Sequence, residues 1–91
     1  MDVYAQIAVK IVQAQEAIIG PVAVEQAERV PHLNIDWSKH EITIDGDEPK
    51  AISALVEAYQ QLFGQVSKEV SKEAAAPLLG QLQGTLPEAL K

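Results

Sequence analysis

Two histidines are the residues of this chain best suited to binding a metal ion. His32 and His40 flank a predicted strand, but they are not spaced four residues apart as in a helical metal site, and the chain has no cysteine that would add a ligand. We therefore interpret both as solvated loop histidines and expect no metal site.

An acidic run, Asp45-Gly46-Asp47-Glu48, has the composition of a calcium-binding loop. An EF-hand loop needs a glycine at its sixth position and a glutamate at its twelfth. Counting from Asp45 places Lys50 and Val56 at those positions, so the match fails. The run is better explained as a turn that caps the helix after it.

Catalytic motifs are missing as well. The sequence contains no nucleophile elbow, no phosphate-binding glycine loop and no dinucleotide-binding turn. A chain of 91 residues also leaves little room for a pocket in which carboxylates could converge. We expect no catalytic residue and no cofactor, and so a protein that is not an enzyme.

The charge balance argues against two kinds of partner. The net charge is −6, and residues 34–48 carry five acids and one base, which gives −4 for that stretch alone. An acidic chain is repelled by nucleic acid and by anionic membranes, so we expect neither as a partner. Polar residues interrupt every long apolar run, the first residues lack the basic region of a signal peptide, and cysteine is absent. We expect a cytoplasmic protein.

The first element is a long amphipathic helix that begins after Asp2, which is placed to cap it. Apolar residues recur at three- and four-residue steps as far as Val30. Gly20-Pro21 interrupts this pattern, because proline lacks the N–H that the helix needs and crowds the preceding turn. The helix either bends there and continues to Val30, which we favour, or stops at Ile19 and restarts with Pro21 in its first turn.

The middle of the chain changes to a two-residue period. Residues 33–37 and 41–45 alternate apolar and polar side chains, which predicts two short strands joined by a turn at 38–40. Trp37 is the single tryptophan. It either fills the space between this hairpin and the helices, which we favour, or is exposed as an anchor for a partner.

A second long helix follows the hairpin. Asp47 and Pro49 form a helix start, and the helical spacing then continues to about Ala76, before Pro77. We expect residues 1–80 to form a single helix–hairpin–helix domain and residues 81–91 a flexible C-terminal tail.

The two predicted helices show a weak internal sequence repeat. Placing Gly20 over Gly64, an offset of 44, aligns apolar with apolar at nearly every core position. Any two amphipathic helices anchored on a glycine would align to some extent. The more specific interpretation is a close helix crossing at the two glycines, because the missing side chains let backbones approach. The predicted crossing or interface residues are Ile11, Ile18, Ile19, Gly20, Pro21, Val22, Leu55, Leu62, Phe63, Gly64 and Val66.

The segment Ile18-Ile19-Gly20-Pro21-Val22-Ala23 resembles a short helical "IGPxA" pattern. That pattern recurs in small uncharacterised domains attached to bacterial signalling proteins such as kinases and response regulators. The resemblance covers about 20 of the 91 residues. It implies a regulatory or scaffolding setting and brings no catalytic residue with it.

Taken together, the sequence predicts an α+β fold, mainly α, with two long helices joined by a short β-hairpin. Two helices cannot cover apolar stripes this wide, so we expect a homodimer in which four helices form a bundle. The predicted function is a non-enzymatic dimerisation or protein-interaction module, regulatory or scaffolding in role. The alternative is a small ligand- or nucleic-acid-binding regulator.

Overall fold

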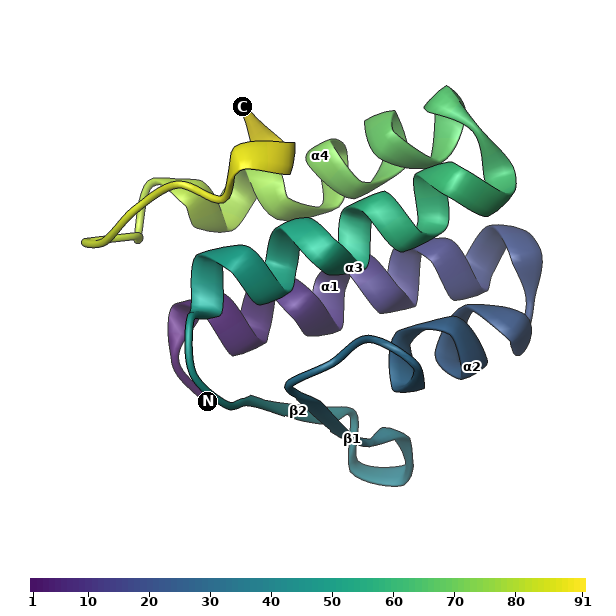
Figure 1. The fold of residues 1–91 in the computed structure, drawn as a ribbon, viewed down its shortest axis with the longest axis horizontal. Helices are drawn as coiled ribbons and strands as arrows, with labels where there is room; N and C mark the ends of the chain where they lie inside the picture. Colours follow the sequence, from purple (N-terminus) through teal and green to yellow (C-terminus); the bar gives the residue numbers. More distant parts are fainter.

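Four helices and a β-hairpin account for most of the chain in the computed structural model, which describes residues 1–91 (Figure 1). The predicted α+β class with a dominant helical content is confirmed, but each expected long helix is two helices. The elements are α1 (Val3–Ile19), α2 (Val22–Glu28), β1 (Leu33–Asp36), β2 (Glu41–Ile44), α3 (Glu48–Phe63) and α4 (Gln65–Leu79), with short 3-10 helices η1 (Trp37–Lys39) and η2 (Glu88–Leu90).

The favoured bend at Gly20-Pro21 is wrong, because the chain stops one helix and starts another there. Gly20 has φ 77° and ψ −159°, a conformation that is essentially restricted to glycine. Its N–H donates to the Glu16 carbonyl at 2.9 Å and so closes the last turn of α1. Its own carbonyl accepts the Ala23 N–H at 3.0 Å, and Pro21 supplies a helical φ of −58° just ahead of α2.

The second half of the chain repeats this junction at the predicted offset. Gly64 has φ 83° and ψ −170°, its N–H donates to the Gln60 carbonyl at 2.8 Å, and its carbonyl accepts the Ser67 N–H at 3.1 Å. The three hydrogen-bonded positions correspond to those around Gly20, each 44 residues later. The helix expected to end before Pro77 is therefore broken at Gly64, and α4 continues through Pro77 to Leu79.

The predicted close crossing at the glycines is wrong. A Cβ atom added at Gly20 or at Gly64 would meet no atom within 4 Å. The two junctions do lie at the same end of the molecule (Figure 1), but the glycines serve there as helix breaks rather than as contact points. The physical reason for glycine is the positive φ that each junction requires.

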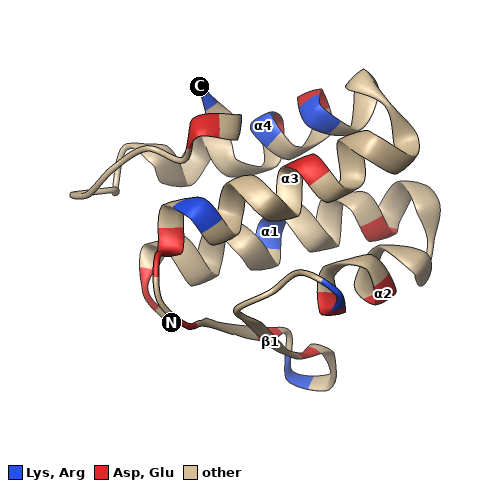
Figure 2. Ribbon diagram, viewed as in Figure 1, with Lys and Arg blue, Asp and Glu red and all other residues tan.

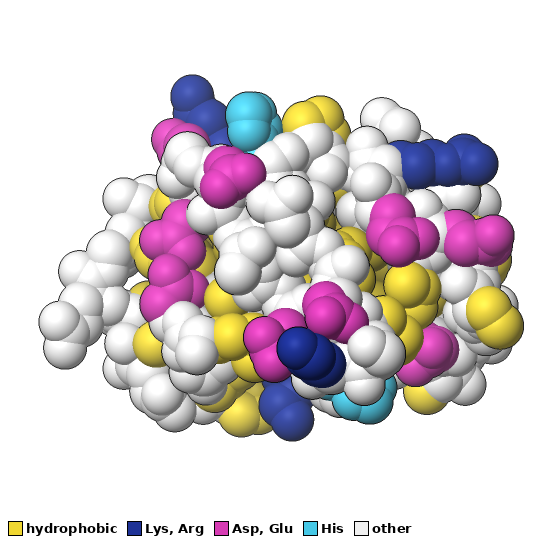
Figure 3. Space-filling view, turned by 90° about the horizontal axis from the view of Figure 1, so that it is seen from below, with side chains coloured by type: hydrophobic (Ala, Val, Ile, Leu, Met, Phe, Trp, Pro, Cys, Tyr) yellow, Lys and Arg dark blue, Asp and Glu magenta, His cyan; other side chains and the backbone are white.

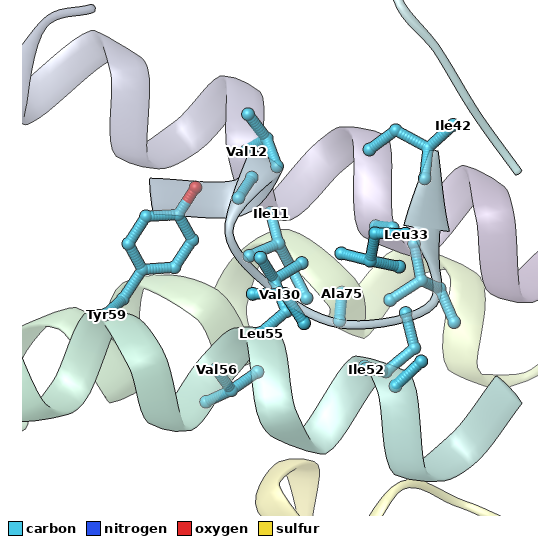
Figure 4. Close-up of a cluster of buried hydrophobic side chains, with 14 of the residues drawn as sticks. Ile11, Val12, Val30, Leu33, Ile42, Ile52, Leu55, Val56, Tyr59 and Ala75 are labelled. Atoms are coloured by element: carbon cyan, nitrogen blue, oxygen red, sulfur yellow. The ribbon is translucent and has the colours of Figure 1, made fainter. Parts of the chain in front are cut away.

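One chain supplies the four helices that we had expected from two. Helix α1 lies in the middle, with α3 and α4 on one side and α2 and the hairpin on the other (Figure 1). Figure 4 shows side chains from α1, α3, α4 and both strands gathered in one cluster with Val30, which follows α2. The largest fully buried core side chains are Ile7, Ile11, Val12, Ile42, Ile52, Leu55, Val56 and Tyr59. Most of the wide apolar surface of α1 is thus covered within one copy.

The predicted β-hairpin is confirmed. Strands β1 and β2 pair antiparallel, with Leu33 opposite Ile44 and Ile35 opposite Ile42. Leu33 and Ile42 are buried in the core, while the polar residues between them are exposed. Two strands alone are marginal in water, and here α1 and α2 provide the apolar surface that they need.

The last residues, expected to be a flexible tail, contribute to the core. Ala89 and Leu90 of η2 are buried and belong to the main apolar cluster, and Pro87 is fully buried beside them. They pack mainly on α3 and partly on α4. None of the four long elements combines the length and the apolar character needed to cross a bilayer.

Candidate functional site

The hollows on the surface are small and open to solvent. The largest, of about 340 Å³, lies between the starts of α1 and α3 and the segment of residues 81–84. Its ionisable lining residues are Asp2, Tyr4 and Glu48. The Tyr4 hydroxyl is engaged, because it donates to the Thr85 carbonyl at 2.7 Å. The remaining ionisable groups of this hollow are therefore the carboxyls of Asp2 and Glu48.

The Asp2 and Glu48 carboxyls are neighbours, and each shifts the pKa of the other. Asp2 caps α1 by accepting the Ala5 N–H at 2.8 Å. A hydrogen bond to Asp2, with smaller contributions from desolvation and from the Asp2 charge, raises the pKa of Glu48 to about 7. Hydrogen bonds from Glu48 and from the Ala5 N–H lower the pKa of Asp2. Glu48 therefore exchanges its proton near neutral pH.

The two histidines stand apart from this hollow. His32 and His40 are both exposed and both adopt positive φ, at 72° and 52°. The His40 ring packs edge-on against Trp37, with the ring centroids 4.8 Å apart. No group of three histidine, cysteine or acidic side chains lies close enough to hold a metal ion.

Trp37 is engaged by its own chain. Its side chain is half-buried, and its indole N–H donates to a carboxylate oxygen of Glu16 at 3.1 Å. This hydrogen bond ties the tip of the hairpin to α1, which is the structural role that we favoured for the residue.

The predicted interface residues differ widely in exposure. Ile11 and Leu55 are fully buried in the core. Ile19, Gly20 and Val22 are half-buried, whereas Pro21 and Gly64 are exposed at the junctions. The remaining four are large apolar side chains in solvent: Ile18 is 62% exposed, Leu62 56%, Phe63 38% and Val66 72%.

These four side chains, which we call the junction patch, come from three helix ends. Ile18 is in the last turn of α1, Leu62 and Phe63 end α3, and Val66 begins α4. Beneath the patch, the buried Gln15 side-chain amide donates to the Ser67 carbonyl at 2.9 Å and to the Ser71 hydroxyl at 3.1 Å. This buried contact joins α1 to α4 and fixes the helix ends relative to one another.

The end of the molecule that carries the junction patch has no charge on its chain segments. Residues 17–24 and 58–67 contain no acidic and no basic side chain. Figure 2 accordingly shows both junctions uncoloured, while charged residues mark every helix elsewhere. The face with the hairpin and α2 has acidic side chains spread across it, with hydrophobic ones between them (Figure 3). Glutamines border the patch, and Gln60 donates to Gln65 at 3.0 Å.

The sequence signalled the patch only in part. The apolar stripe and the glycines identified both junctions, but helical periodicity alone could not separate Ile11 from Ile18, because both lie on the same stripe. The difference arises where the chain turns back at Gly20, because Ile18 in the last turn of α1 is left exposed while Ile11 is covered. Comparison with known proteins found no matching family model, no matching curated protein and no matching solved structure.

Proposed function

We propose that this protein is a non-enzymatic interaction module that self-associates through the junction patch. The observation that carries the proposal is the exposure of Ile18, Leu62, Phe63 and Val66 together at one charge-free end of an acidic chain. Several large apolar side chains exposed at one end of a small protein are a feature of interaction sites. A cytoplasmic regulatory or scaffolding role fits this proposal and the IGPxA-like segment, which includes Ile18 and both residues of the first junction.

A second copy of the chain is the occupant that the charges favour. Two copies carry −6 each and repel one another over most orientations. The charge-free end is where they meet without placing acid against acid. An apolar patch is also complementary to itself, as a two-fold interface requires. None of three surface hollows, the largest among them, is lined by a residue of the junction patch, which favours a protein partner over a small ligand.

The size of the junction patch sets the strength of the association. Its four side chains expose a few hundred Å², on the order of the largest apolar patch of an ordinary monomer. A stable interface takes roughly 800 Å² from each partner. We therefore infer a weak, concentration-dependent dimer rather than the four-helix dimer bundle expected from the sequence, since the core of each copy is already complete.

Nucleic-acid binding, the alternative function, gains no support. The 7 basic residues are spread over the chain, and Figure 2 shows them scattered over several elements. Sequence-independent binding to phosphates needs a basic patch or stripe.

Cysteine cross-linking tests the proposed contact, because the natural chain has no cysteine. We would compare Val66→Cys with Ala76→Cys, which places a thiol at an exposed position near the other end of α4. A short bis-maleimide should link Val66→Cys into dimers at concentrations at which Ala76→Cys stays monomeric. Equal yields of dimer from the two variants would contradict the proposal, because random collision treats both thiols alike.

A further inference from the structure

The C-terminal arm, residues 85–91, packs against the helices as a separate piece of chain, and we call the surface of α3 and α4 beneath it the groove. Pro87, Ala89 and Leu90 are the buried part of this arm. They pack mainly on α3, near Ser53 in its first half, and partly on α4. The arm therefore lies away from Phe63 and the junction patch, so this inference does not depend on the proposed function.

Few bonds hold the arm in place. The Ala89 N–H donates to the Ser53 hydroxyl at 3.1 Å, and the Thr85 carbonyl accepts the Tyr4 hydroxyl at 2.7 Å. The one ion pair of the arm, Lys91 to Glu88 at 2.9 Å, lies within the arm itself. Detaching the arm thus breaks two hydrogen bonds and uncovers three buried side chains, while the four helices keep their own contacts.

The segment before the arm has no regular secondary structure. Residues 80–84 lie outside every helix and strand, and Gly80 and Gly84 bound the segment. Gly84 sits against the Tyr4 side chain, where an added Cβ would come within 2.6 Å of the hydroxyl oxygen. Local units with few contacts and a flexible connection open at lower free energy than the core does.

We propose that the arm is exchangeable, and that its groove recognises a Leu-Pro-x-Ala-Leu segment supplied by a second copy of the chain. The recognised features are those of Leu86 to Leu90: a proline that begins a 3-10 turn, and two apolar side chains that enter the groove. In the free protein the chain's own arm occupies the groove and competes with any arm from outside. Exchange of arms between two copies restores every contact in both, as in domain swapping.

The test measures binding of a fluorescein-labelled peptide of residues 84–91 to the full-length protein by fluorescence anisotropy. Leu90→Glu removes the main apolar contact of the protein's own arm, so this variant should bind the peptide at least tenfold more tightly than the wild type does. Leu90→Ala, a milder change, should give an increase in the same direction. A peptide that itself carries Leu90→Glu is the control and should not bind.

A disulfide staple provides the second half of the test. Ser53→Cys with Ala89→Cys joins the two positions that are already hydrogen-bonded. The oxidised staple should not bind the peptide, and reduction of the same sample should restore binding. The proposal is overturned if the oxidised and reduced forms bind alike. It is also overturned if Leu90→Ala, with a native circular dichroism spectrum, binds no more tightly than the wild type.

Discussion

At the residue scale, the two junction glycines decide where the helices end. Both adopt positive φ with extended ψ, a region in which any Cβ atom is strained. Neither has a neighbour that an added Cβ would touch, so the strain is in the backbone and not in the packing. Backbone strain predicts that the loss of stability depends little on the size of the substituted side chain, whereas close packing predicts that it grows with size.

Replacing Gly64 by alanine should lower the free energy of unfolding by about 1–3 kcal/mol, the range for a side chain forced into a sparsely populated backbone region. The control is Gly80→Ala, because Gly80 has an ordinary helical φ of −66° and also has open space around it. Urea denaturation measures both. Backbone strain predicts that Gly64→Leu costs about as much as Gly64→Ala. A far larger loss for leucine would instead support the close crossing that the structure contradicts.

The Asp2–Glu48 pair makes stability depend on pH. The pKa of Glu48 is about 7 in the folded protein against its ordinary 4.5, so the folded state holds this proton more tightly than the unfolded chain. The stabilisation is fully present below 4.5 and is lost as pH rises through about 7. The other charged or ionisable groups facing the pair are the Met1 amino group, Tyr4 and Asp47.

Glu48→Gln should remove this pH dependence. The wild-type free energy of unfolding should fall as pH rises from 4.5 to about 7 and then level off, whereas the variant should be flatter over that window. Urea denaturation across the window, with the two proteins compared at each pH, isolates the pair from the other charges. Identical slopes for the two proteins would show that Glu48 does not hold the proton.

At the element scale, α2 is the helix with the least support of its own. It has seven residues and no side-chain cap, which is too short to be stable alone. A hydrogen bond anchors it to α3: the hydroxyl of the buried Tyr59 donates to the Ala23 carbonyl at 2.6 Å. Burial raises the pKa of Tyr59, so the hydroxyl keeps its proton and remains a donor.

Tyr59→Phe should therefore lower the free energy of unfolding by about 1 kcal/mol, the usual net value of such a hydrogen bond. Amide hydrogen exchange should speed up most in α2. Tyr4→Phe is the control, since it removes a hydrogen bond of 2.7 Å at an exposed site and leaves α2 untouched. If Tyr4→Phe speeds exchange in α2 as much as Tyr59→Phe does, the hydroxyl of Tyr59 is not what fixes this helix.

The existence and type of the elements could be predicted from the sequence, and their ends could not. Alternation around Ile35 and Ile42 identified the hairpin, and Asp2 and Asp47 cap α1 and α3 as expected. The breaks at Gly20 and Gly64 were not resolved, because apolar periodicity continues across both and a glycine is compatible with a bend or a stop. Pro77 did not end α4, which continues for two more residues to Leu79.

The arm shows the limit of local patterns. Leu86 and Leu90 were predicted to lie in a flexible tail, because chain ends fray and a segment this short gives no periodic signal. Its burial is decided by the groove on α3, which exists only after the helices have packed. The carboxyl pair has the same origin, since Asp2 and Glu48 are far apart in the chain and meet through the fold.

At the scale of the whole molecule, the structure supports a dimer for a different reason than the sequence did. The sequence argument held that two helices own more apolar surface than one copy can bury. Most of that apolar surface is buried within one copy, because α2, α3, α4 and the hairpin cover α1. What remains is the junction patch, and the account now predicts a weak association at that end.

Sedimentation equilibrium over a dilution series tests this central claim most directly, with Val66→Lys and Ala76→Lys as a matched pair that adds the same charge at exposed positions of α4. All three proteins carry the oxidised Ser53→Cys/Ala89→Cys staple, so that arm exchange cannot form dimers. In this background, the wild-type sequence at positions 66 and 76 and the Ala76→Lys variant should rise with concentration from about 9.8 kDa toward twice that mass, while Val66→Lys should stay at the monomer mass. A wild-type protein that remains a monomer at the highest concentration, or a Val66→Lys variant that associates as the wild type does, would contradict the account.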